Sequence, residues 1–271
     1  MKRFFSLLLA FLLTISCGIA SGSGIIIPEI EVPRREIPEN EAMRITREMK
    51  AGWNLGNTFD AIDCTWLEDK MDYETGWCGA RTTEQLIEAV HAAGFRTLRL
   101  PVSWHNHLSD DWTVDADWME RVVQVASWAY DRGMYVIVNI HHDCDEAFYY
   151  PDSAHAKQSE RYIRTLWQQI ASRFADFDEH VIFEGINEPR LKGTGHEWWW
   201  DASNADCRDA MSQIVRLNQV FVDTVRATGG KNADRYLMVP SYDASPDYAC
   251  QAAFSLPEDT AENRIIVSVH A

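Results

Sequence analysis

One stretch of the sequence places a carboxyl group where it could transfer a proton. Residues 181–189 read VIFEGINEP, an apolar run that closes with Asn187, Glu188 and Pro189. A Glu that ends a buried strand is well placed to act as a general acid or base, and the Asn before it could orient a substrate. Considered alone, the same three residues could also form a plain turn at the end of a strand.

Polar residues close five more apolar runs in the same manner. The six runs cover residues 52–57, 97–104, 135–142, 181–188, 236–242 and 265–271. Toward their carboxyl ends they carry, in order, Asn54 and Asn57, Arg99 and Trp104, His141 and His142, Asn187 and Glu188, Tyr242 and Asp243, and His270. A TIM-type barrel gathers chemistry from many strand ends, whereas a doubly wound sheet concentrates it near one switch point. The pattern therefore predicts an α/β fold, a TIM (β/α)8 barrel of which about the first six β/α units are present.

Amphipathic stretches alternate with these runs, as expected of helices that cover a parallel sheet. Apolar residues recur at helical spacing within 86–93, 119–130, 162–174 and 211–225. The spacing Thr82-x-x-Gln85 predicts a capping box that opens the first of these helices, and Gly94 is expected to end it. The run 135–140 reads YVIVNI and is almost continuously apolar, which is typical of a strand buried on both faces.

The ordered set of motifs resembles glycoside hydrolase family 5, in particular its fourth subfamily of endo-acting β-glucanases and xyloglucanases. Six segments carry the resemblance: AGWNLGNT (51–58), AGFRTLRLPVSW (93–104), YVIVNIHHD (135–143), FEGINEPR (183–190), LNQVFVDTVRATG (217–229) and IIVSVH (265–270). The resemblance implies an endo-acting retaining β-glycosidase that hydrolyses β-1,4-glucan-type plant polysaccharides, with no cofactor and no metal ion.

In retaining enzymes of this kind, two carboxyl groups about 5 to 5.5 Å apart flank the scissile bond. The resemblance implies that Glu188 is the acid/base and that Asn187 hydrogen-bonds the sugar 2-hydroxyl. It implies that Arg99 holds the nucleophile's carboxylate ionised, and that His141 and His270 complete the catalytic set. We further expect four residues to contact the substrate: His142, Asn54, Trp104 and Tyr242.

The family's nucleophile is a Glu at the end of a seventh strand, and the resemblance places that strand beyond Ala271. An eight-stranded barrel typically needs about 250 residues. We therefore expect this chain to be a fragment of a longer reading frame, unstable and inactive by itself. A non-catalytic glycan-binding protein built on the same barrel is the alternative function.

Two simpler explanations compete with the catalytic assignments. Arg99 and Glu184 could form a buried ion pair, and for Glu184 we favour this explanation over catalysis. The histidines at 141, 142, 105 and 107 could suggest a metal-dependent hydrolase. Adjacent residues of a strand point to opposite faces, however, and no His-Glu-x-x-His spacing is present, so we expect no metal.

A run of tryptophans and an unusually long loop bear on which substrate is bound. The three tryptophans 198–200 could stack on sugar rings or pack into the scaffold. The loop 61–78 is longer than the family pattern, and Gly79-Ala80-Arg81 replaces the Asn-Pro usual before the next helix. The sequence therefore does not choose among β-1,4-glucan, xyloglucan, mixed-linkage glucan and mannan.

Three domains are predicted: a signal peptide at 1–20, a flexible linker at 21–41 and a partial catalytic barrel at 42–271. Lys2 and Arg3 precede an apolar run of 12 residues, which is too short to span a bilayer. We therefore expect a secreted protein without a membrane span; a lipoprotein anchored through Cys17 is the alternative.

The net charge limits the possible binding partners, and the number of cysteines limits the possible disulfides. A net charge of −16 excludes a nucleic-acid partner, because phosphate binding needs a cationic face. A β-glucan is thus the expected partner, and the sequence identifies no protein partner. Of the five cysteines after the signal peptide, Cys64 and Cys78 are the simplest candidates for a disulfide.

Overall fold

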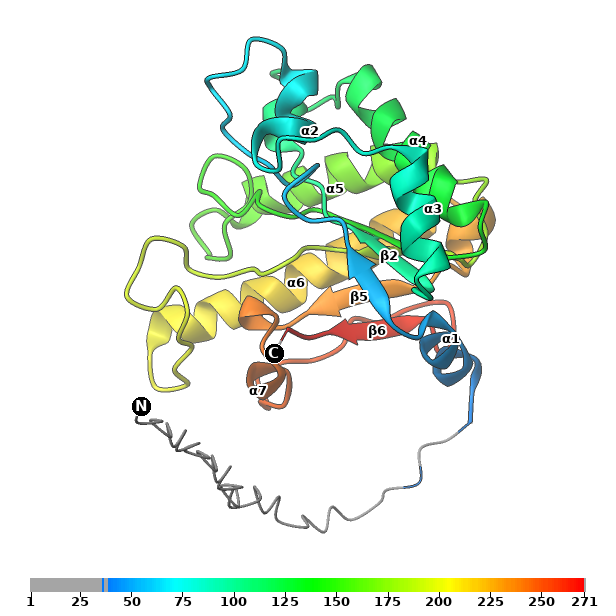
Figure 1. Cartoon of the computed structure of the whole chain (residues 1–271). Helices are drawn as coiled ribbons and strands as arrows, with labels where there is room; N and C mark the ends of the chain where they lie inside the picture. Colours follow the sequence, from blue (N-terminus) through cyan, green and yellow to red (C-terminus); the bar gives the residue numbers. More distant parts are fainter. Residues whose placement is uncertain (1–35, 37–38, 271) are drawn as a thin grey trace, which may run out of the picture. The chain divides into compact units, whose positions relative to one another are not determined.

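Six parallel strands lie side by side in chain order in the computed structural model, which describes residues 36 and 39–270 (Figure 1). They are β1 (Gly52–Asn54), β2 (Thr97–Leu100), β3 (Tyr135–Asn139), β4 (Val181–Glu184), β5 (Leu237–Pro240) and β6 (Ile265–Ser268). Each strand is hydrogen-bonded to the next in parallel register. The predicted α/β arrangement of six β/α units is confirmed.

The strands are shorter than the apolar runs that predicted them. The run 135–142 contributes only Tyr135–Asn139 to β3, and Glu188 lies four residues beyond the end of β4 at Glu184. In β2, Pro101 follows the last strand residue and has no N–H to continue the ladder. Most of the polar residues at the run ends are therefore held by loops, where side chains can converge on a site.

Four long helices cover one side of the sheet: α3 (Glu84–Ala92), α4 (Ala116–Tyr130), α5 (Ala156–Arg173) and α6 (Ala205–Ala227) (Figure 1). Alternate strand residues such as Val136, Val138 and Phe183 are buried in one core cluster with these helices. The intervening residues Ile137 and Ile182 belong to a second cluster. Both faces of β3 and β4 are thus buried, as the apolar runs predicted, whereas β1 is exposed and β6 is largely half-buried.

The short elements lie in the connections. They are η1 (Lys70–Asp72), α2 (Tyr73–Gly76), η2 (His105–His107), η3 (Gly230–Ala233), η4 (Tyr242–Ala244) and α7 (Pro246–Ala249). Among the described residues, no helix has the length and apolar character that crossing a membrane requires.

Helix α1 (Glu41–Met49) was not predicted, because it falls at the boundary of the expected linker. The Asn40 side chain caps it by accepting from the Met43 N–H at 2.9 Å. Its one fully buried residue, Ile45, packs with Tyr135 and Tyr236 at the amino-terminal ends of the strands. The predicted signal peptide, Cys17 and all but a few linker residues lie outside the described residues.

One local prediction is wrong in detail, and one agrees with the structure. Helix α3 is capped by Thr83 rather than Thr82, because Thr83 Oγ1 accepts from Leu86 N at 3.2 Å. Thr82 is instead buried, and its N–H donates to the Glu74 carboxylate at 2.8 Å. Gly94 follows the helix with φ +102°, a conformation that suits glycine and agrees with its expected role as the stop.

The expected disulfide between Cys64 and Cys78 does not form. Cys64 is buried, whereas Cys78 is exposed and its Sγ lies 3.1 Å from the Ala80 carbonyl oxygen. All cysteines within the described part of the chain are free thiols.

Gly185 links β4 to Asn187 and Glu188, and it has no room for a side chain. A Cβ at this position would lie 2.7 Å from Cδ1 of Phe221, which is buried in α6. We predict that Gly185→Ala lowers the free energy of unfolding by about 1–3 kcal/mol, the usual cost of overpacking. Urea unfolding followed by tryptophan fluorescence measures this change.

Gly56→Ala is the matched control, because a Cβ there meets nothing within 4 Å. It should change the free energy of unfolding by less than about 0.5 kcal/mol. Equal stability of the two variants would contradict the close contact with Phe221.

Candidate active site

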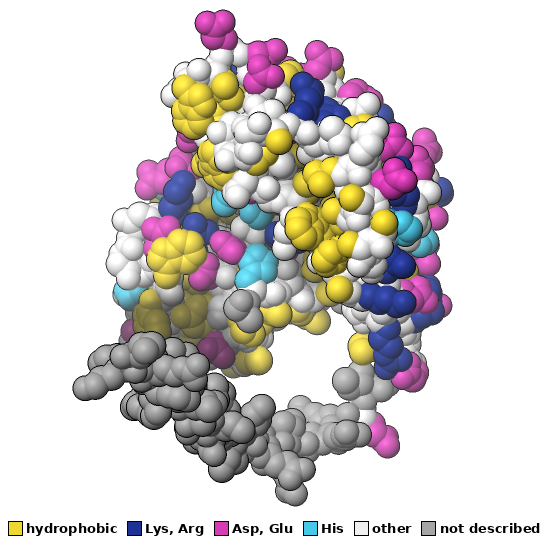
Figure 2. Space-filling model, viewed as in Figure 1, with side chains coloured by type: hydrophobic (Ala, Val, Ile, Leu, Met, Phe, Trp, Pro, Cys, Tyr) yellow, Lys and Arg dark blue, Asp and Glu magenta, His cyan; other side chains and the backbone are white. Residues whose placement is uncertain are grey.

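Six of the nine predicted site residues converge on one pocket at the carboxyl-terminal ends of the strands. The pocket is lined by Asn54, Arg99, His141, Asn187, Glu188, Met238, Val267, Ser268, Val269 and His270. These residues come from β1, β2, β5 and β6 and from the loops after β3, β4 and β6. On the face viewed in Figure 2, histidine, acidic and apolar side chains surround a recess.

Glu184, at the end of β4, is the buried centre of this arrangement. Its Oε2 accepts hydrogen bonds from Arg99 Nε at 2.9 Å and from Asn139 Nδ2 at 2.9 Å. Its Oε1 accepts from Ser268 Oγ at 2.6 Å, and Arg99 Nη2 lies 2.7 Å from Oε2. A buried carboxylate is tolerated only when it is paired and hydrogen-bonded in this way. The ion pair that we favoured for Glu184 is therefore present.

Arg99 uses its remaining N–H groups on two other pocket residues. Nη2 donates to Asn187 Oδ1 at 2.8 Å, and Nη1 donates to Asn54 Oδ1 at 3.3 Å. The planar guanidinium thus fixes Glu184, Asn187 and Asn54 at once. Because the Asn187 oxygen is occupied, its amide nitrogen is the group left to donate to a substrate.

His141 is held as a neutral ring with a defined tautomer. Asn139 Oδ1 accepts from Val102 N at 3.0 Å, so its Nδ2 is the atom that faces His141 Nδ1 at 3.0 Å. Nδ1 therefore accepts a hydrogen bond, and the ring proton is on Nε2. Burial, followed by the charges of His142 and Arg99, lowers the pKa of His141 well below its usual value. His141 is thus a hydrogen-bond donor toward the pocket.

Glu188 is paired with His270. Nδ1 of His270 lies 2.7 Å from Glu188 Oε1, and Arg190 Nη1 lies 3.6 Å from Oε2. The hydrogen bond from His270, together with the charges of His270, Arg190 and His142, lowers the pKa of Glu188, although burial acts in the opposite direction. These groups favour the ionised carboxylate, so proton donation by Glu188 needs a negative charge nearby to oppose them.

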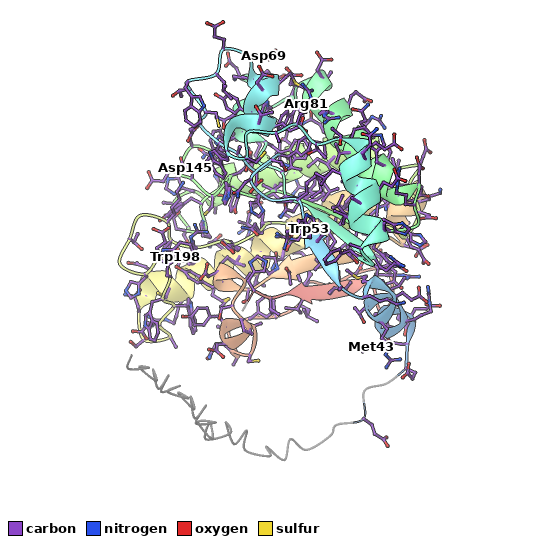
Figure 3. All side chains as sticks on the ribbon, viewed as in Figure 1. Met43, Trp53, Asp69, Arg81, Asp145 and Trp198 are labelled. Carbon is purple, nitrogen blue, oxygen red and sulfur yellow. The ribbon has the colours of Figure 1, made fainter. Side chains whose placement is uncertain are left out.

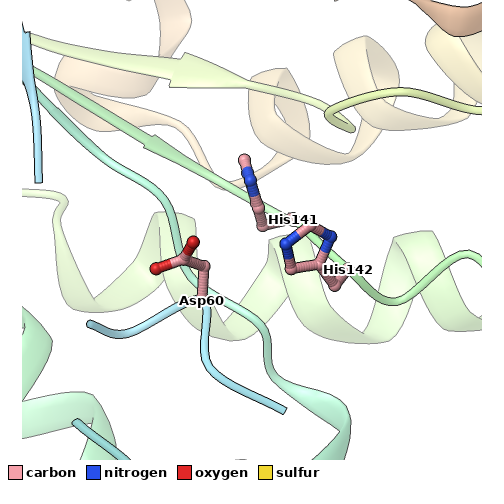
Figure 4. A group of neighbouring side chains, drawn as sticks. All are labelled: Asp60, His141 and His142. Carbon is pink, nitrogen blue, oxygen red and sulfur yellow. The ribbon is translucent and has the colours of Figure 1, made fainter. Parts of the chain in front are cut away.

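Asp60, His141 and His142 are close enough to suggest a metal site (Figure 4). Their ligand atoms lie within 4.8 Å of one another. The two histidines follow β3 rather than lying within it, so their rings are 4.4 Å apart between centroids and do not point to opposite faces as expected. Nevertheless, Nδ1 of His141 already accepts from Asn139 and Nε2 carries the proton, so His141 has no free lone pair for a metal. The donor set does not fit a metal ion.

Two residues predicted to contact the substrate do not reach the pocket. Trp104 is fully buried, and its Nε1 donates to the Asn139 carbonyl oxygen at 2.9 Å. Tyr242 is also fully buried; its hydroxyl donates to the His196 carbonyl oxygen at 2.5 Å and accepts from Leu191 N at 2.9 Å. Both side chains brace the loops that carry the site, and the prediction of substrate contact was wrong for both.

His142 lies in an adjoining hollow that also includes His141. The other lining residues are Ile62, Trp77, Cys144, Arg190 and Lys192. Trp77 is 41% exposed, and its ring centroid is 5.8 Å from that of His142. Its position in the loop 61–78, which departs from the family pattern, was a signal in the sequence that could have pointed to it.

The three consecutive tryptophans divide between surface and core. Trp198 and Trp199 are 60% and 67% exposed, whereas Trp200 is buried and its Nε1 donates to the Cys207 carbonyl oxygen. Trp198, on the loop after β4 (Figure 3), stacks over the Arg190 guanidinium at 4.0 Å. Arg190 also donates to the Glu188 carbonyl oxygen at 2.9 Å, so it links Trp198 to the loop that carries Glu188. Trp200 thus packs into the scaffold, whereas stacking of Trp198 or Trp199 on sugar rings stays a prediction.

Comparisons with known proteins agree with this architecture. Residues 61–271 match the family model described as Cellulase (glycosyl hydrolase family 5). Endoglucanase B of Ruminococcus albus is 40% identical over 250 residues, which cover 89% of this chain and 57% of that protein. Endoglucanase A of the same organism is 39% identical over 238 residues, covering 87% of this chain and 62% of that protein. The chain thus spans about three fifths of these relatives.

Solved structures extend the similarity to the fold. A glycoside hydrolase 5 lichenase from Caldicellulosiruptor sp. F32, solved as a mutant with cellotetraose, is 51% identical with a TM-score of 0.86, covering 90% of this chain and 66% of that one. A GH5-4 broad specificity endoglucanase from Ruminococcus champanellensis with bound cellotriose is 40% identical with a TM-score of 0.78, covering 88% of this chain and 68% of that one. The six strands correspond to part of a (β/α)8 barrel, and the resemblance to the fourth subfamily is confirmed. The chain belongs to glycosyl hydrolase family 5, the cellulase family.

Proposed function

We propose that this chain carries the acid/base half of the active site of an endo-acting retaining β-glucanase. One observation carries the proposal: Glu188 lines a single pocket with Asn54, Arg99, His141, Asn187 and His270, in a chain whose relatives are named endoglucanases. The substrate class is a β-1,4-glucan, xyloglucan or mixed-linkage glucan. The names of the lichenase and of the complexes with cello-oligosaccharides support this class.

In the proposed mechanism, Glu188 starts in its protonated form and gives its proton to the departing glycosidic oxygen. A second carboxylate attacks the anomeric carbon and forms a covalent glycosyl-enzyme while the glycosidic bond breaks. Glu188, now ionised, then takes a proton from water as that water attacks the same carbon and releases the second carboxylate. By the family resemblance, the second carboxylate ends a seventh strand beyond Ala271, and the inactivity of these 271 residues alone stays a prediction.

Glu184 is not a candidate for the second carboxylate. It is fully buried, and both of its oxygens accept hydrogen bonds: Oε2 from Arg99 and Asn139, and Oε1 from Ser268. An attacking carboxylate needs a free lone pair directed at the substrate. Glu184 instead positions the residues that do meet the substrate.

The neighbouring donors suit recognition of sugar hydroxyls. We assign the free amide nitrogen of Asn187 to the 2-hydroxyl, where hydrogen bonds strengthen in the transition state. His141 would donate from Nε2 to another hydroxyl of the same ring, and Asn54 and His142 would contact the substrate beside it. Arg99 acts by orienting Asn187 and Asn54.

We also propose that the protein is secreted, with cell-surface anchoring through Cys17 as the alternative. The basic residues Lys2 and Arg3 and the short apolar run after them support export. An insoluble or very large polysaccharide must be cleaved outside the cell before its products can enter.

The first test is Glu188→Gln in the full-length protein. We predict that kcat/KM on unactivated β-glucan falls by about 10²- to 10⁴-fold, because the poor leaving group needs an acid. With an aryl cello-oligosaccharide that has a good leaving group, kcat/KM should change much less. Initial rates on both substrates measure the difference.

Glu184→Gln is the matched control, since it makes the same chemical change four residues away. It should lower kcat/KM on both substrates alike, because Glu184 positions residues rather than protonating the leaving group. Equal losses on both substrates in Glu188→Gln would remove Glu188 from the acid role, and binding without turnover in the unmutated protein would favour a glycan-binding function.

A second variant, Arg99→Lys, tests the positioning by the guanidinium. One ammonium group cannot bond Glu184, Asn187 and Asn54 together, so the pocket should lose its alignment although the charge is kept. We predict a loss of about 100-fold in kcat/KM, the size expected of a small misplacement in an active site. Steady-state kinetics on a variant whose circular dichroism is unchanged measures it, and full activity would show that a simple cation beside Glu184 is enough.

A further inference from the structure

The loop 61–78, which contains the short helix α2 (Figure 1), places Trp77 on the wall of the hollow beside His142. His141 lines both this hollow and the pocket around Glu188, so the two spaces adjoin. The Trp77 ring is 41% exposed, and such an indole face is a surface on which the C–H bonds of a sugar ring can pack. How the chain holds this ring in place is therefore of interest.

A buried ion pair fastens the loop three residues before Trp77. Glu74, in α2, is fully buried, and its carboxylate accepts from two nitrogens of Arg121 in α4: Oε2 from Nε at 2.9 Å and Oε1 from Nη2 at 2.8 Å. Oε1 also accepts from Thr82 N at 2.8 Å, and Arg121 Nη2 donates to the Thr82 carbonyl oxygen at 2.6 Å. Directional bonds thus join α2 to α4 and to the segment that opens α3.

Close packing restrains α2 on either side of Glu74. A Cβ on Gly76 would lie 2.4 Å from Sγ of the buried Cys64, so the end of α2 packs directly against that side chain. Tyr73 is also buried, and its ring meets that of His107 edge to face with the centroids 5.5 Å apart. The backbone that leads into Trp77 is therefore held at every residue of α2 that faces the core.

Stability alone does not account for the pair of Glu74 and Arg121. Taking two charges out of water costs about as much as their attraction returns, and apolar side chains of similar volume would hold α2 to α4 equally well. The planar guanidinium adds direction, because it bonds both carboxylate oxygens at once. Direction matters for a stacking surface, which adds most to affinity when it is already in place before the ligand arrives.

We propose that Glu74 is a positioning residue, which holds Trp77 in place as a stacking surface for a sugar ring of the β-glucan. The inference rests on the proposed function, because it takes a β-glucan as the ligand. Glu74 is buried and acts only through Trp77. Because Trp77 lies in the adjoining hollow and not beside the scissile bond, it contributes to binding the substrate and not to the bond-breaking step.

A double-mutant cycle in the full-length protein tests the inference on soluble mixed-linkage β-glucan. Trp77→Ala should raise KM by about tenfold, the size of one aromatic stacking contact, and leave kcat unchanged. Glu74→Gln should raise KM in the same way, up to that amount. In the double variant KM should equal that of Trp77→Ala alone, because Glu74 then has no ring to position. A further rise of KM in the double variant, an equal fall of kcat in both backgrounds, or an unchanged KM in Trp77→Ala would overturn the inference.

Asp259→Asn is the matched control. Asp259, before β6, accepts two hydrogen bonds of 2.7 Å from Arg226 in α6, so this variant breaks another buried pair of the same kind. Its KM should equal that of the unmutated protein, and a rise like that in Glu74→Gln would show a general effect of losing such a pair. Arg121→Lys takes the place of Glu74→Gln if the latter does not fold, because it keeps a cation beside Glu74 but loses the two-nitrogen contact.

A second measurement reads the positioning without hydrolysis. Calorimetry gives the Kd of cellotetraose for Glu188→Gln, alone and combined with Glu74→Gln or with Trp77→Ala. Both combinations should raise Kd, by up to about tenfold. An unchanged Kd in the combination with Glu74→Gln refutes the positioning role. Retained hydrolysis of β-glucan by Glu188→Gln instead refutes the acid role in the proposed function, and the values of KM then decide the positioning role by themselves.

Discussion

A carboxylate that is removed from water inside a sheet must be surrounded by donors, and Glu184 imposes this requirement on the whole site. Arg99 from β2, Asn139 from β3 and Ser268 from β6 satisfy it. Two of these donors have a second consequence, because Arg99 orients Asn187 and Asn54, and Asn139 fixes the tautomer of His141. The geometry of the pocket therefore depends on pairing one buried charge.

Two glutamates four residues apart have different roles because their environments differ. Glu184 ends β4 and is fully buried, whereas Glu188 follows in the loop, where it lines the pocket and meets His270. Gly185 allows the chain to pass close to Phe221 between them. The hydrogen bond from His270, together with the charges of His270, Arg190 and His142, lowers the pKa of Glu188. Under the proposed function, this segment therefore supplies both a structural and a chemical carboxyl group.

The order of the strands and the pocket around Glu188 could be predicted from the sequence, because polar residues that close successive parallel runs must meet at one edge. The predictions of substrate contact for Trp104 and Tyr242 were wrong, because an aromatic residue at the end of an apolar run can turn into the core as well as into the cleft. Asn139 and Ser268 were missed, although each is a polar residue inside an apolar run and so carried a signal. The direction in which the His142 side chain points relative to His141 depends on the residue at which β3 ends. The pattern of apolar residues does not determine that residue.

We propose that Glu188 is one half of a retaining pair of carboxyl groups. The most direct test is proton NMR of the first products released from a β-glucan by the full-length protein, before mutarotation. Two successive displacements at the anomeric carbon predict that the β-anomer appears first. Initial release of the α-anomer would show a single displacement by water and would contradict the mechanism.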